Sequence, residues 1–208
     1  GLDLSWSINA RVNNINKDVL KVLKRAGCWM IQLGVESGNS NILRTIKKGI
    51  TLKRAEEACK LAYDEGFVVK TYFIIGHPNE TEDTINETIK FMTKLPSHYA
   101  SINFMTPFPG TELWDMAEKY GTFDKEKLER INYLSDEPAF IPSGLTEELL
   151  KEKLREAYLK FYLNPRTIFR YFKAFRGIED FKKTLTALSI IMNIIYAKIF
   201  SKSVKENV

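Results

Sequence analysis

The segment "KTYFIIGHPNET", residues 70–81, contains the signal on which the fold assignment depends. Aromatic and β-branched residues run up to Gly76, and the tripeptide His-Pro-Asn follows at once. An acidic stretch, residues 79–84, then predicts the start of a helix. An apolar run bounded by a turn predicts a buried strand that ends abruptly. In α/β proteins such strand ends are where a small molecule is held.

The same strand-then-helix pattern occurs four times in the first 120 residues. The expected strands are 4–12, 28–35, 67–76 and 100–107, and a helix pattern follows each of them. Serial units of this kind indicate an α/β fold in which right-handed crossovers join parallel strands. Because the carboxyl ends of parallel strands meet at one edge of a sheet, a ligand is expected at that edge.

Capping residues and apolar periodicity locate the helices. Asn16 is expected to cap the first helix, and Thr51 is expected to cap the longer helix before the third strand. Five apolar residues make up the predicted inward face of the first helix: Val19, Leu20, Val22, Leu23 and Ala26. Residues 28–35 are apolar almost throughout, which predicts a strand covered on both faces.

The character of the chain changes after residue 122. A Pro-containing loop leads to Thr146, which predicts the cap of a long amphipathic helix that ends at Asn164 and Pro165. Two further helices are expected at 165–175 and 178–200. The predicted organisation is therefore an α/β part over residues 1–122 and a helical extension over residues 123–208.

The composition predicts a folded chain in a reducing compartment. Of its 208 residues 44% are hydrophobic, which is enough for one well-filled core. The net charge is +5, but 31 basic and 26 acidic residues are interspersed, which indicates a solvated surface and does not favour nucleic-acid binding. Cys28 and Cys59 lie in apolar neighbourhoods and predict core residues. A cytoplasmic location is expected, since the first residues do not form a signal peptide.

Three strand-end motifs together resemble a known family. They are "IQLGVESGNSNILRTIKKGIT", "FIIGHPNETEDTINETIKF" and "NFMTPFPGTELW". In this order and spacing they resemble the second half of the radical S-adenosylmethionine (radical SAM) enzyme barrel. The likeness is to the branch that often carries an upstream cobalamin-binding domain, where GIESG, FIxGxPGET and PxPGT motifs recur. It covers residues 4–120 and implies a partial (β/α) barrel with a C-terminal helical extension.

The resemblance implies a site for S-adenosylmethionine across the strand ends. Glu36 and Ser37 are implied as polar contacts to the ribose or the amino-acid part. Arg11 is implied to pair with the methionyl carboxylate through a charge-assisted hydrogen bond. The apolar residues before Gly76 are implied to flank the adenine. The implied cofactor-binding residues are Arg11, Glu36, Ser37, Ile74, Ile75, Gly76 and Met105.

The sequence departs from the family pattern in two ways. Asn79 stands where the family has Gly in its PGET turn, and Asn tolerates the left-handed conformation that such a turn needs. The chain contains no CxxxCxxC motif, the three-cysteine loop by which the family binds its [4Fe-4S] cluster. The sequence therefore predicts the C-terminal portion of a longer enzyme, inactive alone, whose cluster is bound by residues outside this chain.

The resemblance also implies cofactors and partners for the whole enzyme. Reductive cleavage of S-adenosylmethionine yields a 5′-deoxyadenosyl radical that abstracts hydrogen from a substrate, which the sequence does not identify. A reductant such as flavodoxin or ferredoxin is implied, and cobalamin is a further candidate cofactor. The histidines, His77 and His98, form no metal-ligand pattern, so surface or capping roles are expected.

Other interpretations of the sequence stay open. One is a non-catalytic βα scaffold that has lost the cluster segment and binds a partner through its tail. Another is an unrelated barrel enzyme with phosphate-bearing substrates, which the absence of a Gly-rich phosphate loop disfavours. The apolar run 185–200 is 16 residues long, shorter than the ~20 of a spanning helix. It predicts a buried helix, with contact to a membrane surface as the alternative.

Overall fold

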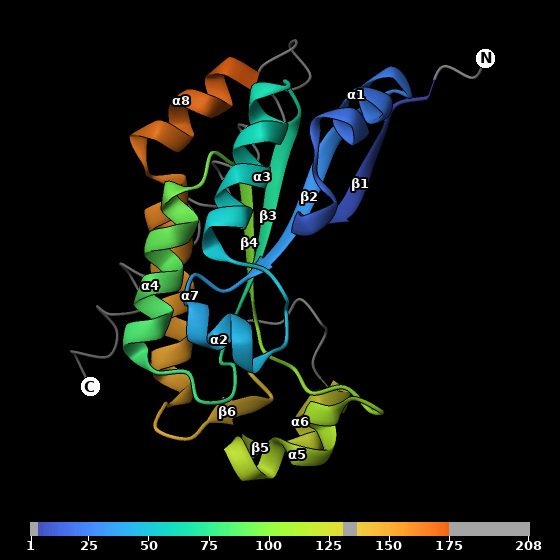
Figure 1. Cartoon of the computed structure of the whole chain (residues 1–208). Coiled ribbons are helices and arrows are strands. Elements are labelled where there is room, and N and C mark those ends of the chain that lie inside the picture. The colour runs from blue at the N-terminus through green and yellow to red at the C-terminus, as the bar shows by residue number, and fades with distance from the viewer. Residues whose placement is uncertain (1–3, 131–136, 175–208) are drawn as a thin grey trace. The chain divides into compact units, whose positions relative to one another are not determined.

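The computed structural model describes residues 4–130 and 137–174, which form an α/β fold around a parallel sheet (Figure 1). The strands are β1 (Trp6–Arg11), β2 (Cys28–Glu36), β3 (Val68–Ile75) and β4 (Tyr99–Phe104). They lie side by side in the order β1-β2-β3-β4, and each neighbouring pair is parallel. The predicted fold class and strand direction are confirmed, and the described sheet is open.

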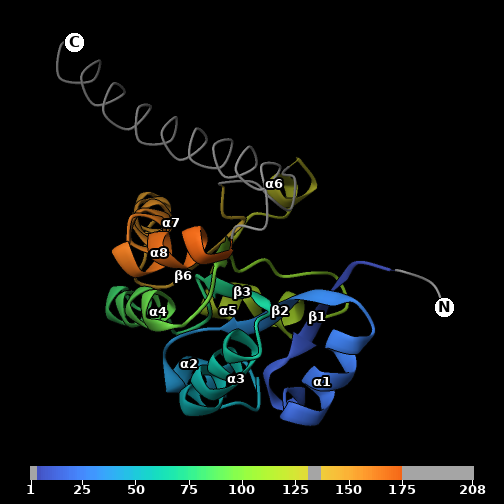
Figure 2. The same ribbon diagram turned by 90° about the horizontal axis from the view of Figure 1, so that it is seen from above.

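The crossovers between the strands are helical, as predicted. A short 3-10 helix, η1 (Val12–Asn14), and α1 (Lys17–Arg25) join β1 to β2. Two helices, α2 (Ser40–Thr45) and α3 (Leu52–Asp64), join β2 to β3, and α4 (Glu82–Lys94) joins β3 to β4. The expected caps are present, since Asn16 accepts a hydrogen bond from the Val19 amide and Thr51 accepts one from the Arg54 amide. Figure 2 shows α1 and α3 on the same face of the sheet.

The two faces of the sheet differ in character. Alternate residues on the face toward the helices are fully buried, among them Ile31, Val69 and Phe73. The residues between them, such as Gln32 and Lys70, are only partly buried. The expectation that residues 28–35 would be covered on both faces was therefore wrong, because the described helices cover one face and leave the other open.

The predicted inward face of the first helix was also partly wrong. Leu20 is buried, but Val19 and Val22 are 38% and 55% exposed. Helix α1 lies at the edge of the sheet formed by β1 and packs mainly against β2. Because few strands lie beneath it, only a narrow stripe of the helix is buried.

Helix α7 (Glu147–Tyr162) covers the free edge of β4. It packs against both α4 and β4. The Tyr158 hydroxyl donates to the Ile102 carbonyl at 3.1 Å and accepts from the Ile102 amide at 3.4 Å, and the Tyr162 hydroxyl donates to the Ala100 carbonyl at 3.0 Å. These contacts occupy backbone groups that an edge strand otherwise leaves available for unwanted pairing.

The other elements of the described residues are short. They are α5 (Glu112–Tyr120), β5 (Gly121–Phe123), α6 (Lys125–Arg130), β6 (Phe140–Pro142) and α8 (Pro165–Ala174). Strands β5 and β6 pair antiparallel, which the sequence had not indicated. Contacts separate residues 1–168 from residues 169–208, and the division expected after residue 122 stays a prediction. The predicted helix 178–200 lies outside the described residues.

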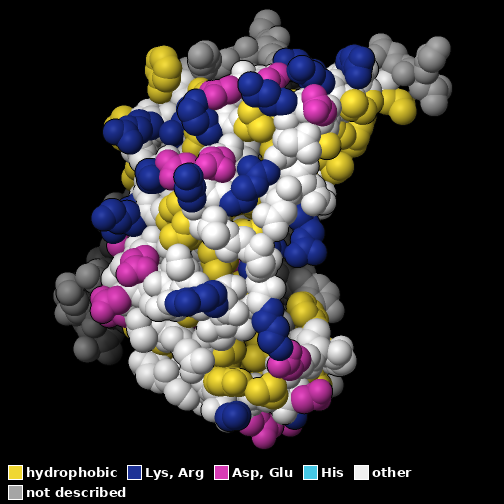
Figure 3. Space-filling view, in the orientation of Figure 1, with side chains coloured by type: hydrophobic (Ala, Val, Ile, Leu, Met, Phe, Trp, Pro, Cys, Tyr) yellow, Lys and Arg dark blue, Asp and Glu magenta, His cyan; other side chains and the backbone are white. Residues whose placement is uncertain are grey.

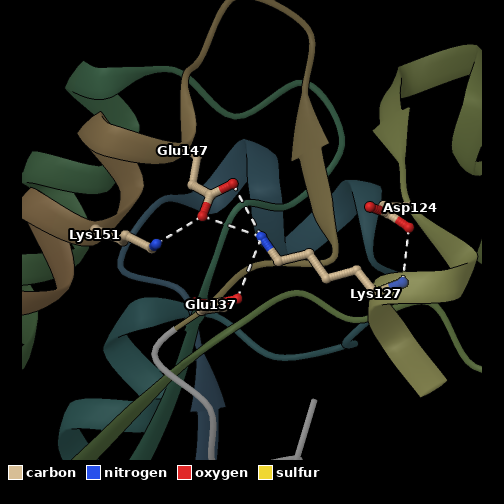
Figure 4. Close-up of polar contacts among 5 residues, drawn as sticks. All are labelled: Asp124, Lys127, Glu137, Glu147 and Lys151. Carbon is tan, nitrogen blue, oxygen red and sulfur yellow. Dashed lines mark hydrogen bonds and ion pairs between the residues drawn. The ribbon is translucent and has the colours of Figure 1, made fainter. Parts of the chain in front are cut away.

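An ion-pair network connects α6 to the start of α7 (Figure 4). The Lys127 ammonium lies 3.0 Å from Glu147 and 3.7 Å from Glu137, and Glu147 also pairs with Lys151 at 2.7 Å. The Lys127 amide donates to Asp124 at the start of α6. The network therefore holds the first turn of α7 beside α6.

The surface agrees with the charge pattern of the sequence. Figure 3 shows Lys and Arg interleaved with Asp and Glu over the face in view. None of the helices in residues 4–130 and 137–174 combines the length and apolar character needed to span a membrane.

The tyrosine contacts to β4 generate a stability prediction. The double variant Tyr158→Phe/Tyr162→Phe keeps both rings but leaves backbone groups of β4 without their partners. We expect the free energy of unfolding to fall by about 1–3 kcal/mol, as is typical for lost buried hydrogen bonds. Urea denaturation measures this, with Tyr120→Phe on α5 as the matched control. An equal effect in the control would contradict the role assigned to the two hydroxyls.

Candidate active site at the carboxyl edge of the sheet

The parallel register brings the ends of all four strands to one edge of the sheet. Arg11, the last residue of β1, lies opposite Gly34 on β2, and Gly34 lies opposite Tyr72 on β3. On the other side of β3, Ile74 pairs with Asn103 of β4. Residues from four separate sequence segments thus meet where the sequence predicts a ligand.

Glu36 ends β2 in an unusual backbone conformation. Its φ is 73°, and the β2–β3 register shifts between Gly34 and Glu36. The Glu36 carboxylate pairs with the Lys48 ammonium at 2.6 Å, and both side chains are about one-fifth exposed. A Cβ at Gly34 would lie 2.7 Å from the Glu36 carboxylate oxygen and 3.2 Å from the Lys48 nitrogen, so glycine leaves room for the pair. Sequence reasoning missed Lys48, whose distance of 12 residues from Glu36 gives no local signal.

Ser37 has a structural role in the same loop. Its side chain is fully buried, and its hydroxyl lies 3.1 Å from the Thr88 hydroxyl of α4. It also accepts a hydrogen bond from the Asn39 amide. The Ser37 hydroxyl therefore holds the loop after β2 against α4, and its contact with a cofactor stays a prediction.

The residues at the end of β3 lie in three different environments. Ile74 is half-buried on the open face, whereas Ile75 is fully buried in the core between the sheet and its helices. The Ile75 carbonyl accepts the Met105 amide at 2.7 Å and so extends the pairing beyond β4. Gly76 has a φ of 85°, a conformation that favours glycine. Of this group, Ile74 is the one whose side chain faces the open side.

The turn after β3 encloses two titratable side chains. Asn79 has a φ of 61°, so the prediction that it supports the left-handed turn is confirmed. One oxygen of the Glu80 carboxylate accepts from the Gly76 amide at 2.5 Å and from the His77 amide at 3.0 Å. His77 is 2% exposed, so the expected surface role was wrong. Within the described residues, neither ring nitrogen of His77 nor the second Glu80 oxygen has a hydrogen-bond partner.

Burial changes the protonation of both side chains. It raises the pKa of Glu80 to about 7, and the amide hydrogen bonds from His77 and Gly76 oppose that shift. It lowers the pKa of His77 to about 4, with the Glu36 backbone acting in the opposite direction. At neutral pH the imidazole of His77 is therefore neutral, and the Glu80 carboxyl is near the midpoint of its titration.

A cavity of about 260 Å³ lies at this edge of the sheet. Pro78 from the turn after β3 and Met105 from the end of β4 line it on one side. The end of α2 and helix α5 complete the wall with Thr45, Ile46, Lys47, Thr111, Glu112, Leu113, Met116 and Tyr120. Of the predicted cofactor-binding residues, Met105 is the one that lines this cavity.

The cysteines do not fit a [4Fe-4S] cluster. Cys28 and Cys59 are both buried, and burial raises the pKa of the Cys59 thiol to about 12, which disfavours the thiolate that binds metal. Across the described ranges, no group of three or more His, Cys, Asp or Glu side chains is placed to hold a metal ion. Both cysteines are core residues, as predicted.

The geometry defines an α/β protein in which a cavity and polar side chains lie at the carboxyl ends of parallel strands. Residues 1–92 match the family model of the Radical SAM superfamily. An uncharacterized methyltransferase of Pyrococcus horikoshii is 37% identical over 170 residues, which cover 82% of this chain and 37% of the relative. The chain belongs to the radical SAM superfamily.

Solved structures agree with the fold. Coproporphyrinogen III oxidase from Escherichia coli, a radical SAM enzyme, superimposes with a TM-score of 0.54 at 19% identity over 77% of this chain and 32% of that one. A radical S-adenosylmethionine methyltransferase from Kitasatospora setae gives a TM-score of 0.50 at 19% identity over 54% of this chain and 21% of that one. The chain spans 37% and 29% of the lengths of two curated relatives that it matches.

Glu80 generates a prediction about the pH dependence of stability. Because its pKa in the folded state is raised from 4.5 to about 7, the folded protein binds more protons than the unfolded chain between these values. The contribution of Glu80 to the free energy of unfolding is therefore most favourable below pH 4.5, and it is lost as the pH rises to about 7. In Glu80→Gln this loss does not occur. We expect the unfolding free energy of the variant, relative to wild type, to rise by up to about 3 kcal/mol across this range.

Urea unfolding at both ends of the range measures this difference. His77 is present in both proteins, so its opposite titration cancels in the comparison. Glu57→Gln, on the exposed side of α3, is the matched control, and its difference from wild type should be the same at both pH values. A difference for Glu80→Gln that is independent of pH would contradict the raised pKa.

Proposed function

We propose that this chain forms the cofactor-holding half of a radical SAM enzyme, with S-adenosylmethionine lying across the carboxyl ends of β1 to β4. The observation that carries the proposal is the meeting of chemically distinct groups at one sheet edge. Arg11 supplies a cation, Glu36 supplies a carboxylate, and Ile74 and Met105 supply apolar surface. Superfamily membership supports the choice of this cofactor.

These side chains match the parts of S-adenosylmethionine. The Arg11 side chain is exposed, and no acidic group of the described residues pairs with it, so it is available to the methionyl carboxylate. Glu36 offers oxygens to the ribose hydroxyls or the amino group, with Lys48 fixing its position. The apolar side chain of Ile74 suits the face of the adenine. In this proposal the chain binds and orients the cofactor and excludes water from it.

The chemistry itself belongs to the cofactors of the whole protein. A [4Fe-4S] cluster and S-adenosylmethionine together supply reductive cleavage and a 5′-deoxyadenosyl radical, which is the reaction that the family implies. Methyl transfer is the candidate outcome, because the relative with 37% identity is named a methyltransferase. Cobalamin, a protein reductant and contact with a membrane surface remain expectations from the sequence.

The proposal is tested by titrating S-adenosylmethionine into the full-length protein in a calorimeter. Arg11→Met removes the charge-assisted hydrogen bond to the methionyl carboxylate and should weaken binding about 10- to 100-fold. A second probe, 5′-methylthioadenosine, lacks the amino-acid part, so its affinity should be unchanged in the same variant. Arg25→Met, at the exposed end of α1, is the matched control and should bind both compounds like the wild type.

The two probes separate a specific contact from a general loss. Equal weakening of both compounds in Arg11→Met would contradict the assigned contact, because the variant would then have disturbed the fold. If neither compound binds the wild-type protein, the non-catalytic scaffold becomes the better interpretation.

The cluster is tested separately by metal analysis. The full-length gene product, purified without oxygen, is expected to contain about four iron and four sulfide per chain. Residues 1–208 expressed alone should contain none above background. Replacing both cysteines in the full-length protein, Cys28→Ser/Cys59→Ser, should leave the iron content unchanged, because both are core residues. Loss of iron in that double variant would contradict the assignment of the cluster to residues outside this chain.

A further inference from the structure

The open face of the sheet contains a second hollow, toward the amino ends of β2 to β4. Its volume is about 410 Å³, and its wall includes Gln32 of β2, Lys70 of β3, and Tyr99 and Ser101 of β4. Tyr158 and Tyr162 of α7 close one side. Lys70 precedes the last residue of β3 by five positions, which is about 16 Å along an extended strand. The hollow is therefore separate from the cavity at the carboxyl edge.

Lys70 is a half-buried cation without a carboxylate partner within the described residues. Its ammonium lies 4.5 Å from the centre of the Tyr72 ring, a cation–π contact. The register places Gln32 on one side of Lys70 and Tyr99 on the other, so its cross-strand neighbours carry no negative charge. By contrast, Lys48 and Lys153, which are largely buried, lie within 2.8 Å of a glutamate. Lys70 thus has an unused capacity to bind an anion.

The wall beside Lys70 is aromatic and fixed in position. The Tyr158 and Tyr162 rings are nearly parallel, with an interplanar angle of 16° and centroids 6.2 Å apart. Their hydroxyls donate to the backbone of β4, which holds the rings in place beside the hollow. A flat apolar surface beside a cation suits a planar ring that carries a negative group.

We propose that this hollow anchors the substrate through a carboxylate attached to a planar unsaturated ring. Lys70 binds the carboxylate, Gln32 and Ser101 offer an amide and a hydroxyl donor, and the tyrosine rings form an aromatic wall on one side of the ring system. The assignment of the ligand as substrate rests on the proposed function. With the carboxylate held deep on the open face, the remainder of the substrate extends toward the strand ends. In this arrangement Lys70 determines which substrate binds and takes no part in the reaction, because it lies far from the carboxyl edge where the cofactor is proposed to bind.

The test uses 1-naphthoate and its uncharged analogue 1-naphthamide as probes, titrated into the whole protein in the absence of S-adenosylmethionine. Wild type should bind 1-naphthoate at least tenfold more tightly than 1-naphthamide. Lys70→Met should remove this preference, and Lys70→Arg should restore most of it. Lys90→Met, on the exposed side of α4, makes the same charge change and should bind both probes like the wild type. Equal binding of the two probes by wild type, or a preference that survives Lys70→Met, would overturn the proposal.

A second measurement avoids dependence on a folded variant. Acetylation of wild-type lysines, followed residue by residue with mass spectrometry, should slow at Lys70 when 1-naphthoate is present and stay unchanged at Lys90. Unchanged acetylation at Lys70 under saturating 1-naphthoate would also overturn the proposal. Because neither measurement involves S-adenosylmethionine, its outcome is independent of the cofactor-binding test.

Discussion

The parallel pairing of β1 to β4 is the constraint on which the other features depend. Since all four strands run in one direction, their carboxyl ends must lie at the same edge, and each crossover must return the chain along one face. The helices that do this bury alternate residues of β2, β3 and β4. Polar groups that follow the strands are thereby collected at one edge, although they lie far apart in the chain. On the other face of the sheet, the side chains of β2 and β3 are only partly buried and do not pack against these helices.

Local backbone strain is concentrated at this edge and is held by buried contacts. Glu36 and Asn79 both have positive φ, a conformation that costs non-glycine residues of the order of 1–3 kcal/mol. The Lys48 ion pair fixes the first position, and the two amide hydrogen bonds to Glu80 fix the turn that contains the second. Burying Glu80 and His77 without full hydrogen bonding is a further cost. Backbone strain and incomplete hydrogen bonding that are concentrated at one edge of a sheet indicate a functional region there.

The two proposed ligand positions lie on a common surface. Ile74 and Lys70 alternate with core residues on β3, so both belong to the open face, one near the carboxyl edge and one near the amino end. A cofactor at the edge and a substrate anchored deeper along the strands would occupy one continuous region of the sheet. Helix α7 takes part in that region because the tyrosines that cover the edge of β4 also form the wall of the hollow.

Local signals in the sequence were sufficient for the strands β1 to β4, the caps at Asn16 and Thr51, the turn at Asn79 and the family. Each of these depends on residues within a few positions of one another, where backbone preferences and hydrogen bonds act directly. The burial of His77, the exposure of Val22 and the Lys48–Glu36 pair were beyond sequence reasoning. So were the bond from Ser37 to an α4 residue 51 positions away and the cover of β4 by a helix 56 positions away. These features depend on contacts between segments that are far apart in the sequence. Only the packing of those segments in the folded chain determines which side chains are buried and which groups become partners.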